Sequence, residues 1–515
     1  MGLLIPKHLY PYRYFFLGAT LLVLYRIFTG FFAPLPLQVD EAQYVGWSHK
    51  LEAGYYSKPP FIAWVLGFNQ WACRSFGIES LEGCSRSLQA LALAVASACA
   101  GLSSWALFRN LKAAVFTATL LVTSPLFGFY SLFATTDAWL LMWWSLALWL
   151  FILAIHSKDR EILFWVLCGV AVGFGLLSKY SMGIFVLSAF LWTVCAREIF
   201  KKGPWIAVSI AVLIFLPNIV WNYENGFPTI SHHIEISQVQ NLSANSWDLV
   251  RSISSFAQFF LAQFLLLGPL VMIGFLRACF KFGREKPCFR KPHLILVFFV
   301  APIFLVVLAQ AFLTRAHANW AAPAYIGVAI LVIGIWFEKT AGGGRRSQRA
   351  FYSLSVGFGL VCSMVFIHGL KFIYWSPNAP SVRAVESLRG WKEAALNLIE
   401  LAEKNDIAIV AEDRRILAAV NAYRGSKLIE IYSFDSSGRR SNHYSWFDNA
   451  DDQPRLVNQM VIWARVESSS SQDALGTDIG AGPNLQSRQS LAFIAVAGGS
   501  ERVAVQVDLW GVIKK

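Results

Sequence analysis

The sequence predicts an all-α polytopic membrane bundle of about 11 transmembrane helices, followed by a small C-terminal α/β domain outside the membrane. The chain of 515 residues is 56% hydrophobic and 15% charged, with a mean hydropathy of +0.50, whereas soluble domains carry about 25% charged residues. Apolar stretches of about 20 residues recur, and this is the length that crosses about 30 Å of hydrocarbon. From about Pro377 the composition becomes polar, and strand-like segments alternate with helical ones.

Hydropathy predicts the spans, and the cationic loops predict their orientation. With a cytoplasmic N-terminus, every loop rich in Lys and Arg lies on the cytoplasmic side, as the positive-inside rule requires. An odd number of spans then places the C-terminal segment on the outer side of the membrane. Topology also accounts for the net charge of +13, so we expect a lipid bilayer and no nucleic acid as partner. The predicted spans are 14–33, 86–108, 113–131, 138–156, 162–178, 181–196, 205–221, 254–276, 294–313, 319–337 and 351–374.

The predicted division is a transmembrane domain at 1–376, with outer loops at 34–85 and 222–250, and an outer α/β domain at 377–515. The first apolar segment is too long for a signal core and lacks a small-residue cleavage site, so we expect a membrane helix there. In the C-terminal domain we expect a mobile loop at 467–490, which is rich in Ser, Gly, Asp and Gln. The other predicted elements are helices at 381–405 and 412–423 and strands at 406–410, 427–434, 456–466, 491–496 and 502–513.

The eight cysteines form no Cys-x-x-Cys pair, which gives no support for a zinc or redox motif. Buried, inert thiols are the usual interpretation of such cysteines. Cys73 and Cys84 in the first outer loop could form a disulfide, a question that sequence alone leaves open because it does not show the geometry.

The first outer loop carries an adjacent acid pair, Asp40 and Glu41, in the stretch QVDEAQYVGWSHKLEAGYYSKPPF. One interpretation is a helix cap, with Asp40 as N-cap and Gln43 completing a capping box. The other is catalytic, because a general base must be a carboxylate or histidine placed beside the attacking hydroxyl. A carboxylate at the rim of a bilayer is costly unless it is paired or solvated. A helix cap explains one acid well and two adjacent acids less well.

Lys58 stands directly before a Pro-Pro step in the same loop and follows Tyr55 and Tyr56. The prolines hold the backbone extended and rigid. A lysine so placed could snorkel to the interface, or it could serve as a point charge for a phosphate. Both interpretations stay open on the residues alone.

Other polar residues fall at the predicted outer side. Asp137 begins a spanning helix there, as an N-cap or as part of a site, and Lys179 lies at an outer hairpin, where it could snorkel or meet a lipid phosphate. Scattered histidines are usually structural or surface groups. Alternatively, with Asp40 and Asp137, they could hold a divalent cation, although no tight ligand spacing exists and no cofactor is clearly required. The remaining candidates are His232, His233, His317 and Asn319.

Taken together, these motifs resemble the GT-C type membrane glycosyltransferases. The likeness is to the bacterial branch that contains the lipid A aminoarabinose transferase, related sugar transferases of lipopolysaccharide and the protein O-mannosyltransferases. The matching pieces occur in the expected order between about Gln38 and Tyr423. They are DEAQY, YYSKPP, TTDA, GLLSKY, PNIVWNYENGFP, HANWAAPAYI, RGWKEAA and AEDRRILAAVNAY.

The resemblance implies an enzyme that moves a hexosyl or pentosyl group, with inversion, from a polyprenyl-phosphate sugar to lipid A or the lipopolysaccharide core. The reaction would occur at the periplasmic face of the bacterial inner membrane. By position, Asp40 matches the acid of the family's first outer loop and Asp137 that of the second. Lys58 matches the lysine near the donor phosphate, although Ser57 precedes it here and this flanking position varies.

We therefore expect Asp40 to act as the general base, with Glu41 and Asp137 in support. We expect the donor phosphate to bind at Lys58, Tyr55, Tyr56 and Lys179.

Three other functions stay open. A protein O-glycosyltransferase would use the same type of donor. A lipid-sugar transporter or flippase should show charges and broken or repeated helices near the middle of the bilayer, whereas the acids here cluster at one face. A structural membrane protein with a partner-binding outer domain would not need the acid, lysine and aromatic cluster. The sequence does not identify the sugar, the acceptor or the oligomeric state.

Overall fold

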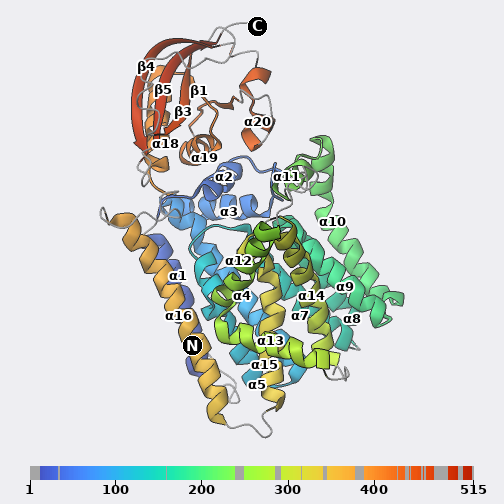
Figure 1. The fold of residues 1–515 in the computed structure, drawn as a ribbon. Helices are drawn as coiled ribbons and strands as arrows, with labels where there is room; N and C mark the ends of the chain where they lie inside the picture. Colours follow the sequence, from blue (N-terminus) through green and yellow to red (C-terminus); the bar gives the residue numbers. More distant parts are fainter. Residues whose placement is uncertain are drawn as a thin grey trace. The chain divides into compact units, whose positions relative to one another are not determined.

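The structure is a computed structural model whose chain divides into two compact units (Figure 1). The first unit comprises 1–32, 86–226 and 233–368, and the second comprises 33–85, 227–232 and 369–515. The second unit thus groups the first outer loop with the C-terminal segment. The division of the chain into two domains at residue 376 stays a prediction. The structure describes residues 12–32, 35–157, 159–237, 249–284, 291–314, 316–339, 345–376, 388–425, 427–434, 440, 442–453, 456, 460–468, 485–496 and 503–512.

The first unit is built from helices, and it confirms the predicted helical class. Nine helices in the described part of the chain are long and apolar enough to cross a membrane. They include α1, α4, α7, α8, α10, α12, α14, α15 and α16. The bounds are α1 (Arg13–Phe32), α4 (Leu81–Phe108), α5 (Leu111–Thr123), α6 (Pro125–Tyr130), α7 (Thr136–His156), α8 (Glu161–Ser178), α9 (Gly183–Cys195), α10 (Lys202–Glu224), α11 (Pro228–Ser237), α12 (Leu249–Leu267), α13 (Pro269–Arg284), α14 (Lys291–Leu313), α15 (Ala322–Lys339) and α16 (Arg345–Trp375).

All eleven predicted spans fall on helical segments, but some are shorter or interrupted. The span predicted at 113–131 is divided into α5 and α6, because Pro125 cannot continue the hydrogen-bond ladder of α5. The span at 254–276 is divided into α12 and α13 at Gly268, whose φ is 100°. The span at 181–196 corresponds to the 13-residue α9 and a preceding 3₁₀ turn at Tyr180–Met182. The exact count of crossings stays a prediction.

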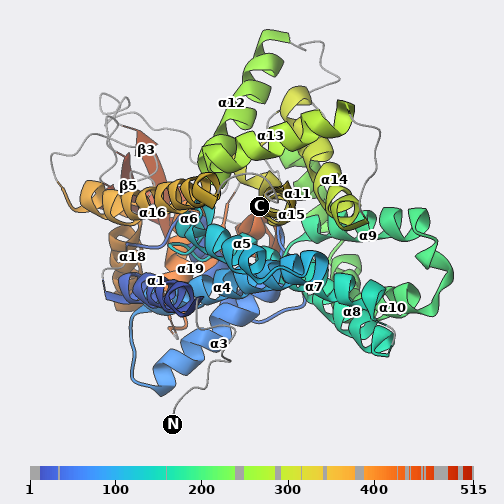
Figure 2. The same cartoon turned by 90° about the horizontal axis from the view of Figure 1, so that it is seen from below.

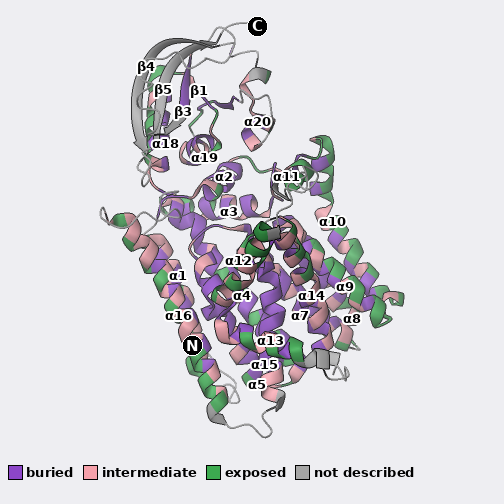
Figure 3. Cartoon of the chain, viewed as in Figure 1, coloured by how far each residue is buried: buried purple, intermediate pink, exposed green. Residues whose placement is uncertain are grey.

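Within this unit, α7 packs against α8 and α8 against α10, and the three lie side by side in both ribbon views (Figures 1 and 2). The approach of α8 to α10 requires Gly169, because a Cβ there would lie 2.5 Å from the carbonyl oxygen of Ala207. Buried residues concentrate on α7 and α15, whereas α10 and α16 expose much of their surface (Figure 3). Apolar side chains on those exposed faces suit contact with lipid.

The second unit joins α2 (Val39–Ser48) and α3 (Phe61–Ser75) to a small α/β assembly. A disulfide between Cys73 and Cys84, with Cα atoms 6.3 Å apart, settles the pairing that the sequence left open. Helix α2 packs on α19 at Gly46, where a Cβ would lie 2.5 Å from Asn421 Nδ2. The further helices of the unit are α18 (Trp391–Asn405), α19 (Arg414–Tyr423) and α20 (His443–Phe447).

The sheet of this unit has five strands in the order β2-β1-β3-β5-β4. Strand β1 is parallel to β2 and β3, while β3 and β4 are antiparallel to β5. Each strand overlaps a predicted one, so the α/β composition is confirmed, but α20 was not predicted. Strand β4 begins six residues earlier than predicted, inside the expected loop at 467–490, and 469–484 lie outside the described residues. The strands are β1 (Ala408–Ala411), β2 (Ile431–Ser433), β3 (Met460–Ser468), β4 (Leu485–Val496) and β5 (Val503–Val512).

Candidate functional site

The start of α2 is capped by Gln38 and not by Asp40. The Gln38 backbone N–H donates to Glu41 Oε2 at 3.0 Å, and the Gln38 side chain accepts from the backbone of the third helical residue, Glu41. The predicted capping box of Asp40 and Gln43 is therefore wrong by two positions. Glu41 is only 1% exposed and its carboxylate is used by the cap, which suits a role in holding the loop.

Asp40 is left exposed by this arrangement. Its side chain is 66% exposed, and Arg414 Nη1 on α19 lies 3.8 Å from Asp40 Oδ1. That separation is too long for a hydrogen bond, and an exposed pair of this kind contributes little to stability. Asp40 is thus an accessible carboxylate at the first turn of α2, with a cation nearby that the sequence analysis did not single out.

The loop after α2 is held by Tyr55, whose predicted role was phosphate binding. The Tyr55 hydroxyl donates to the carbonyl oxygens of Lys50 at 2.9 Å and Trp47 at 3.1 Å and accepts from the Glu52 backbone N–H. The Tyr55 ring stacks on Trp47 with centroids 4.6 Å apart. These contacts use the hydroxyl within the protein, so in this structure Tyr55 positions the loop. The Tyr55 backbone N–H donates to the carbonyl oxygen of Lys58 at 3.1 Å, which ties the predicted phosphate-binding lysine to the same turn.

Tyr56 brings one of the predicted histidines to this loop. The centroid of the His232 ring lies 5.0 Å from that of Tyr56, and the Trp446 ring from α20 lies 5.8 Å away on the same tyrosine. The second unit therefore gathers the loop, part of the second outer insertion and α20 around Tyr56. Trp446 was missed from the sequence because it lies about 390 positions after Tyr56, and no local pattern marks it.

In the first unit, Asp137 and Lys179 form an ion pair with 2.8 Å between Lys179 Nζ and Asp137 Oδ1. Their side chains are only 12% and 19% exposed, respectively. The N-cap of α7 is Thr135, whose hydroxyl accepts from the Ala138 backbone N–H, so the interpretation of Asp137 as an N-cap is wrong. Asp137 is instead a largely buried acid in the first turn of α7. Its cation comes from the residue that caps the C-terminal end of α8.

A polar cluster surrounds the neighbour of Lys179. Tyr180 donates from its hydroxyl to Asn218 Oδ1 at 3.1 Å, and Asn222 on the next turn of α10 lies near both. The His233 ring lies 5.7 Å from that of Tyr180. Both asparagines belong to the motif PNIVWNYENGFP, which the sequence analysis quoted, but their side chains were not predicted as site residues.

The remaining predicted site residues are Asn319 and His317. Asn319 lies beside the hydroxyl of Tyr130, as does Asp137. His317 is the N-cap residue of the 3₁₀ turn Ala318–Ala321, with its ring 5.3 Å from that of Trp320. Within the described ranges, no group of three or more His, Cys, Asp or Glu side chains could hold one metal ion. Binding of a divalent cation stays a prediction.

Comparison with known proteins connects these groups to a family. The family model described as dolichyl-phosphate-mannose-protein mannosyltransferase matches residues 57–221. Lipid A galacturonosyltransferase RgtD of Rhizobium johnstonii is 29% identical over 386 residues, covering 74% of this chain and 76% of that protein. The undecaprenyl phosphate-alpha-4-amino-4-deoxy-L-arabinose arabinosyl transferase of Erwinia tasmaniensis is 25% identical over 382 residues, covering 67% of this chain and 64% of that protein.

The fold has a counterpart among solved structures. The crystal structure of ArnT from Cupriavidus metallidurans bound to undecaprenyl phosphate superposes with a TM-score of 0.61 and 14% identity, covering 97% of this chain and 98% of that one. This likeness concerns the fold. The comparisons confirm the resemblance predicted from the motifs: the chain is similar in sequence and in fold to the GT-C type membrane glycosyltransferases, a group that includes sugar transferases of lipid A and lipopolysaccharide.

Proposed function

We propose that the chain is an inverting glycosyltransferase that moves a sugar from a polyprenyl-phosphate donor to lipid A or the lipopolysaccharide core on the periplasmic face of the inner membrane. The observation that carries the proposal is the match to a lipid A galacturonosyltransferase over 74% of this chain and 76% of that protein. The ArnT structure with a similar fold was solved with undecaprenyl phosphate, which supports a lipid phosphate as the donor carrier.

In the proposed reaction, an acceptor oxygen forms a bond to the anomeric carbon while the bond from that carbon to the phosphate oxygen breaks. The polyprenyl phosphate leaves with the electron pair, and the acceptor proton passes to a base. Asp40 suits the base because its carboxylate is exposed and makes no hydrogen bond with Arg414 at 3.8 Å. Asp137 is less suited, because Lys179 already holds its carboxylate in a largely buried ion pair.

The leaving phosphate develops negative charge, which a fixed cation stabilises. Lys58 is the proposed cation, since its backbone is held by Tyr55 on one side and by Pro59 and Pro60 on the other. Such a loop fixes the backbone of Lys58 before the phosphate binds, so only its side chain loses conformational entropy on binding. We propose that Lys179 acts on Asp137, and through it on the outer end of α7, instead of binding the phosphate as predicted from the sequence.

Mass spectrometry of lipid A and core oligosaccharide, from cells with and without the gene, tests the proposal. We expect one glycan mass to disappear with the gene and to return on complementation. The size of the missing mass identifies the sugar, and its location identifies the acceptor. Identical lipid A and core masses in both strains would contradict the proposal.

Protein modification is the second candidate, because the family model that matches residues 57–221 is named for a protein mannosyltransferase. It predicts unchanged lipid A and core, with loss of sugar from periplasmic proteins. A flippase would move lipid-linked sugar without forming a new glycosidic bond. Purified protein in nanodiscs distinguishes the flippase, since a nanodisc has no compartments to connect and any new bond must come from transfer.

A further inference from the structure

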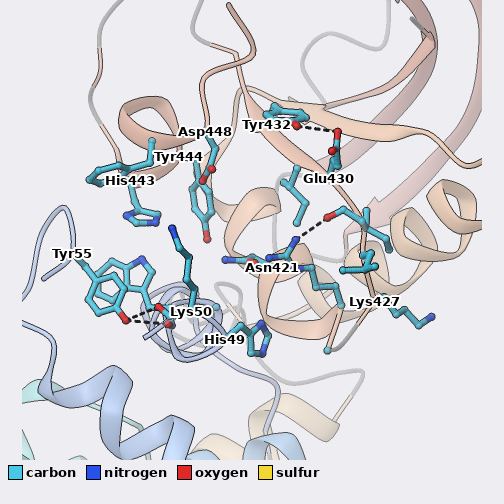
Figure 4. Close-up of a pocket in the computed structure, with 18 of the residues that line it drawn as sticks. His49, Lys50, Tyr55, Asn421, Lys427, Glu430, Tyr432, His443, Tyr444 and Asp448 are labelled. Carbon is cyan, nitrogen blue, oxygen red and sulfur yellow. Dashed lines mark hydrogen bonds between the residues drawn. The ribbon is translucent and has the colours of Figure 1, made fainter. Parts of the chain in front are cut away.

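A pocket of about 790 Å³ lies within the second unit, between the C-terminal end of α2 with its following loop and the facing helices α19 and α20 (Figure 4). Its size falls within the range of sites for small organic ligands. Neither Asp40 nor Lys58 lines it. Trp47, which does, follows Asp40 by seven residues on the same helix, or about 10 Å along its axis. The pocket is therefore separate from the proposed base, yet a rigid helix connects the two.

Asp448 lies in the wall of this pocket, at the C-terminal end of α20. Its carboxylate makes no hydrogen bond or ion pair with any residue that the structure describes. Burial nevertheless raises the pKa of Asp448 to about 6, although Lys50 and Arg424 act in the opposite direction. Asp448 is half-buried in the wall of the pocket, and a partly desolvated carboxylate favours a ligand that donates hydrogen bonds to it.

Cations stand near this acid. Arg424 uses one N–H to hold the carbonyl oxygen of Ile429 at 2.7 Å, and its other N–H groups make no further hydrogen bond among the described residues. Lys50 pairs with Glu52 at 2.7 Å, but its own side chain is 86% exposed. Figure 4 shows Lys50 extending toward His443, Tyr444 and Asp448 on the opposite wall. Hydrogen-bond donors and an acceptor thus face the same space.

The rest of the wall is aromatic and carries polar atoms without partners. The ring of His443 stands edge-on to Trp47 with centroids 5.4 Å apart. Among the described residues, His443 Nδ1 and Trp47 Nε1 have no hydrogen-bond partner. The Tyr444 hydroxyl lies near the Asn421 side chain, and neither this hydroxyl nor Asn421 Oδ1 makes a hydrogen bond of ordinary geometry with a described residue. Buried polar atoms normally have partners, from the protein or from something bound.

This combination selects one class of ligand. A bare phosphate would be repelled by Asp448 and Glu52, and a simple cation would be repelled by Lys50 and Arg424. A peptide is not favoured, because the edge strand β2, which reaches the pocket, is only three residues long and its Ser433 backbone N–H already donates to the carbonyl oxygen of Asp448. A saccharide has hydroxyl groups that both donate and accept, so it can satisfy the carboxylate and the guanidinium together, and its apolar ring face suits aromatic walls.

We propose that this pocket binds a sugar unit of the acceptor glycan that is not itself glycosylated, with Asp448 and Arg424 holding its hydroxyl groups. The inference rests on the proposed function for its assignment to the acceptor. The donor sugar must lie at the base and the leaving phosphate, whereas this pocket includes neither Asp40 nor Lys58. Contacts with a remote part of a substrate that are equal in the ground and transition states lower KM without raising kcat.

Binding and kinetics on the full-length protein in nanodiscs test the inference. The probe is the phosphorylated oligosaccharide obtained by complete deacylation of lipopolysaccharide, which cannot be confused with a lipid bound by the helices. Titration calorimetry compares wild type with Asp448→Ala, and with Glu400→Ala as the matched control. Glu400 is an exposed acid on α18 and does not line the pocket. Thermal melts show whether both variants are folded.

We expect Asp448→Ala to weaken oligosaccharide binding roughly 10-fold or more, the usual effect of losing a hydrogen bond to a charged group. In transfer assays its KM for the acceptor should rise, with kcat and the KM for the donor unchanged, because remote contacts bind ground and transition states alike. Glu400→Ala should match wild type.

Equal binding by wild type and Asp448→Ala, with both folded, would overturn the inference. If the free donor monosaccharide bound at the Asp448 pocket and the oligosaccharide did not, the assignment of this pocket to the acceptor would be overturned. Pocket-dependent binding by a protein that transfers no sugar would refute the proposed function while supporting a saccharide site. Failure of the saccharide site and failure of the proposed function are therefore distinguishable.

Discussion

Lys179 Nζ lies 2.8 Å from Asp137 Oδ1, and the two residues are 42 positions apart in the chain. The pair joins the first turn of α7 to the C-terminal end of α8 with little exposure to solvent. Breaking a buried ion pair from one side leaves an uncompensated charge, which costs about 3–5 kcal/mol. Replacing both partners with neutral groups of similar size costs much less.

The ion pair therefore predicts that Asp137→Asn and Lys179→Met each lower the unfolding temperature, and that the double variant recovers most of the loss. The measurement is a double-mutant cycle of thermal unfolding in one detergent. An additive double variant would show that the pair does not contribute to stability. The transfer rate of the recovered double variant then reports any catalytic role of Asp137 separately from its role in folding.

Asp40→Asn should leave stability unchanged and reduce transfer by about 10²- to 10⁴-fold, because an amide cannot accept the proton of the acceptor. The structure sharpens this test, since Gln38 and Glu41 cap α2 and Asp40 does not. Glu41→Gln is the matched control, because glutamine also completes a capping box. Near wild-type turnover of purified, folded Asp40→Asn would refute the assignment of the base.

Lys58→Ala should reduce use of the donor roughly 10- to 150-fold, corresponding to about 1.5–3 kcal/mol for a charge-assisted hydrogen bond. The measurement is transfer at varied donor concentration in membranes. Lys404→Ala, which removes an exposed cation on α18, controls for the change in net charge. Unchanged donor kinetics in Lys58→Ala would remove this lysine from the site.

Asp448→Asn should raise the unfolding temperature at pH 8, and the difference from wild type should shrink as the pH falls toward 4. Burial raises the folded-state pKa of Asp448 to about 6 from its usual 3.8, so the folded protein binds the proton more readily than the unfolded chain does. The charged form thus destabilises wild type above about pH 6, and protonation relieves this as the pH falls.

His443 contributes in the opposite direction, because burial lowers its pKa to about 4 and the unfolded chain takes up the proton first. Comparing Asp448→Asn with wild type at each pH cancels that shared effect. The nearby charges of Lys50, Arg424 and Glu52 are present in both proteins. A difference that does not change with pH would contradict the raised pKa of Asp448.

The alternation of cationic loops predicts a periplasmic C-terminus. A reporter active only in the periplasm, fused after Lys515, should give signal, and one active only in the cytoplasm should not. A matched pair of fusions between the spans predicted at 319–337 and 351–374, on the predicted cytoplasmic side, should give the reverse result. The opposite pattern would contradict the predicted topology, through either an inverted orientation or a different number of crossings.

The sequence by itself determined the features that depend on local composition. Hydropathy over about 20 residues located the helices, because the cost of placing a polar backbone or side chain in lipid is paid within each segment. Alternation of apolar residues located the five strands, and the ordered motifs indicated the enzyme group.

The tertiary structure decided which residues share an environment. The pairing of Asp137 with Lys179, the approach of Arg414 to Asp40, and the disulfide between Cys73 and Cys84 each join separated positions in the chain. Which residue caps α2 depends on the backbone geometry at Gln38, and the sequence, with its two adjacent acids, does not show that geometry. The pocket at Asp448 forms only where α2 packs on α19 at Gly46. Packing between distant segments determines how far a carboxylate is buried and which groups lie beside it. Burial and neighbouring groups in turn set the charge state of the carboxylate and its availability as a base.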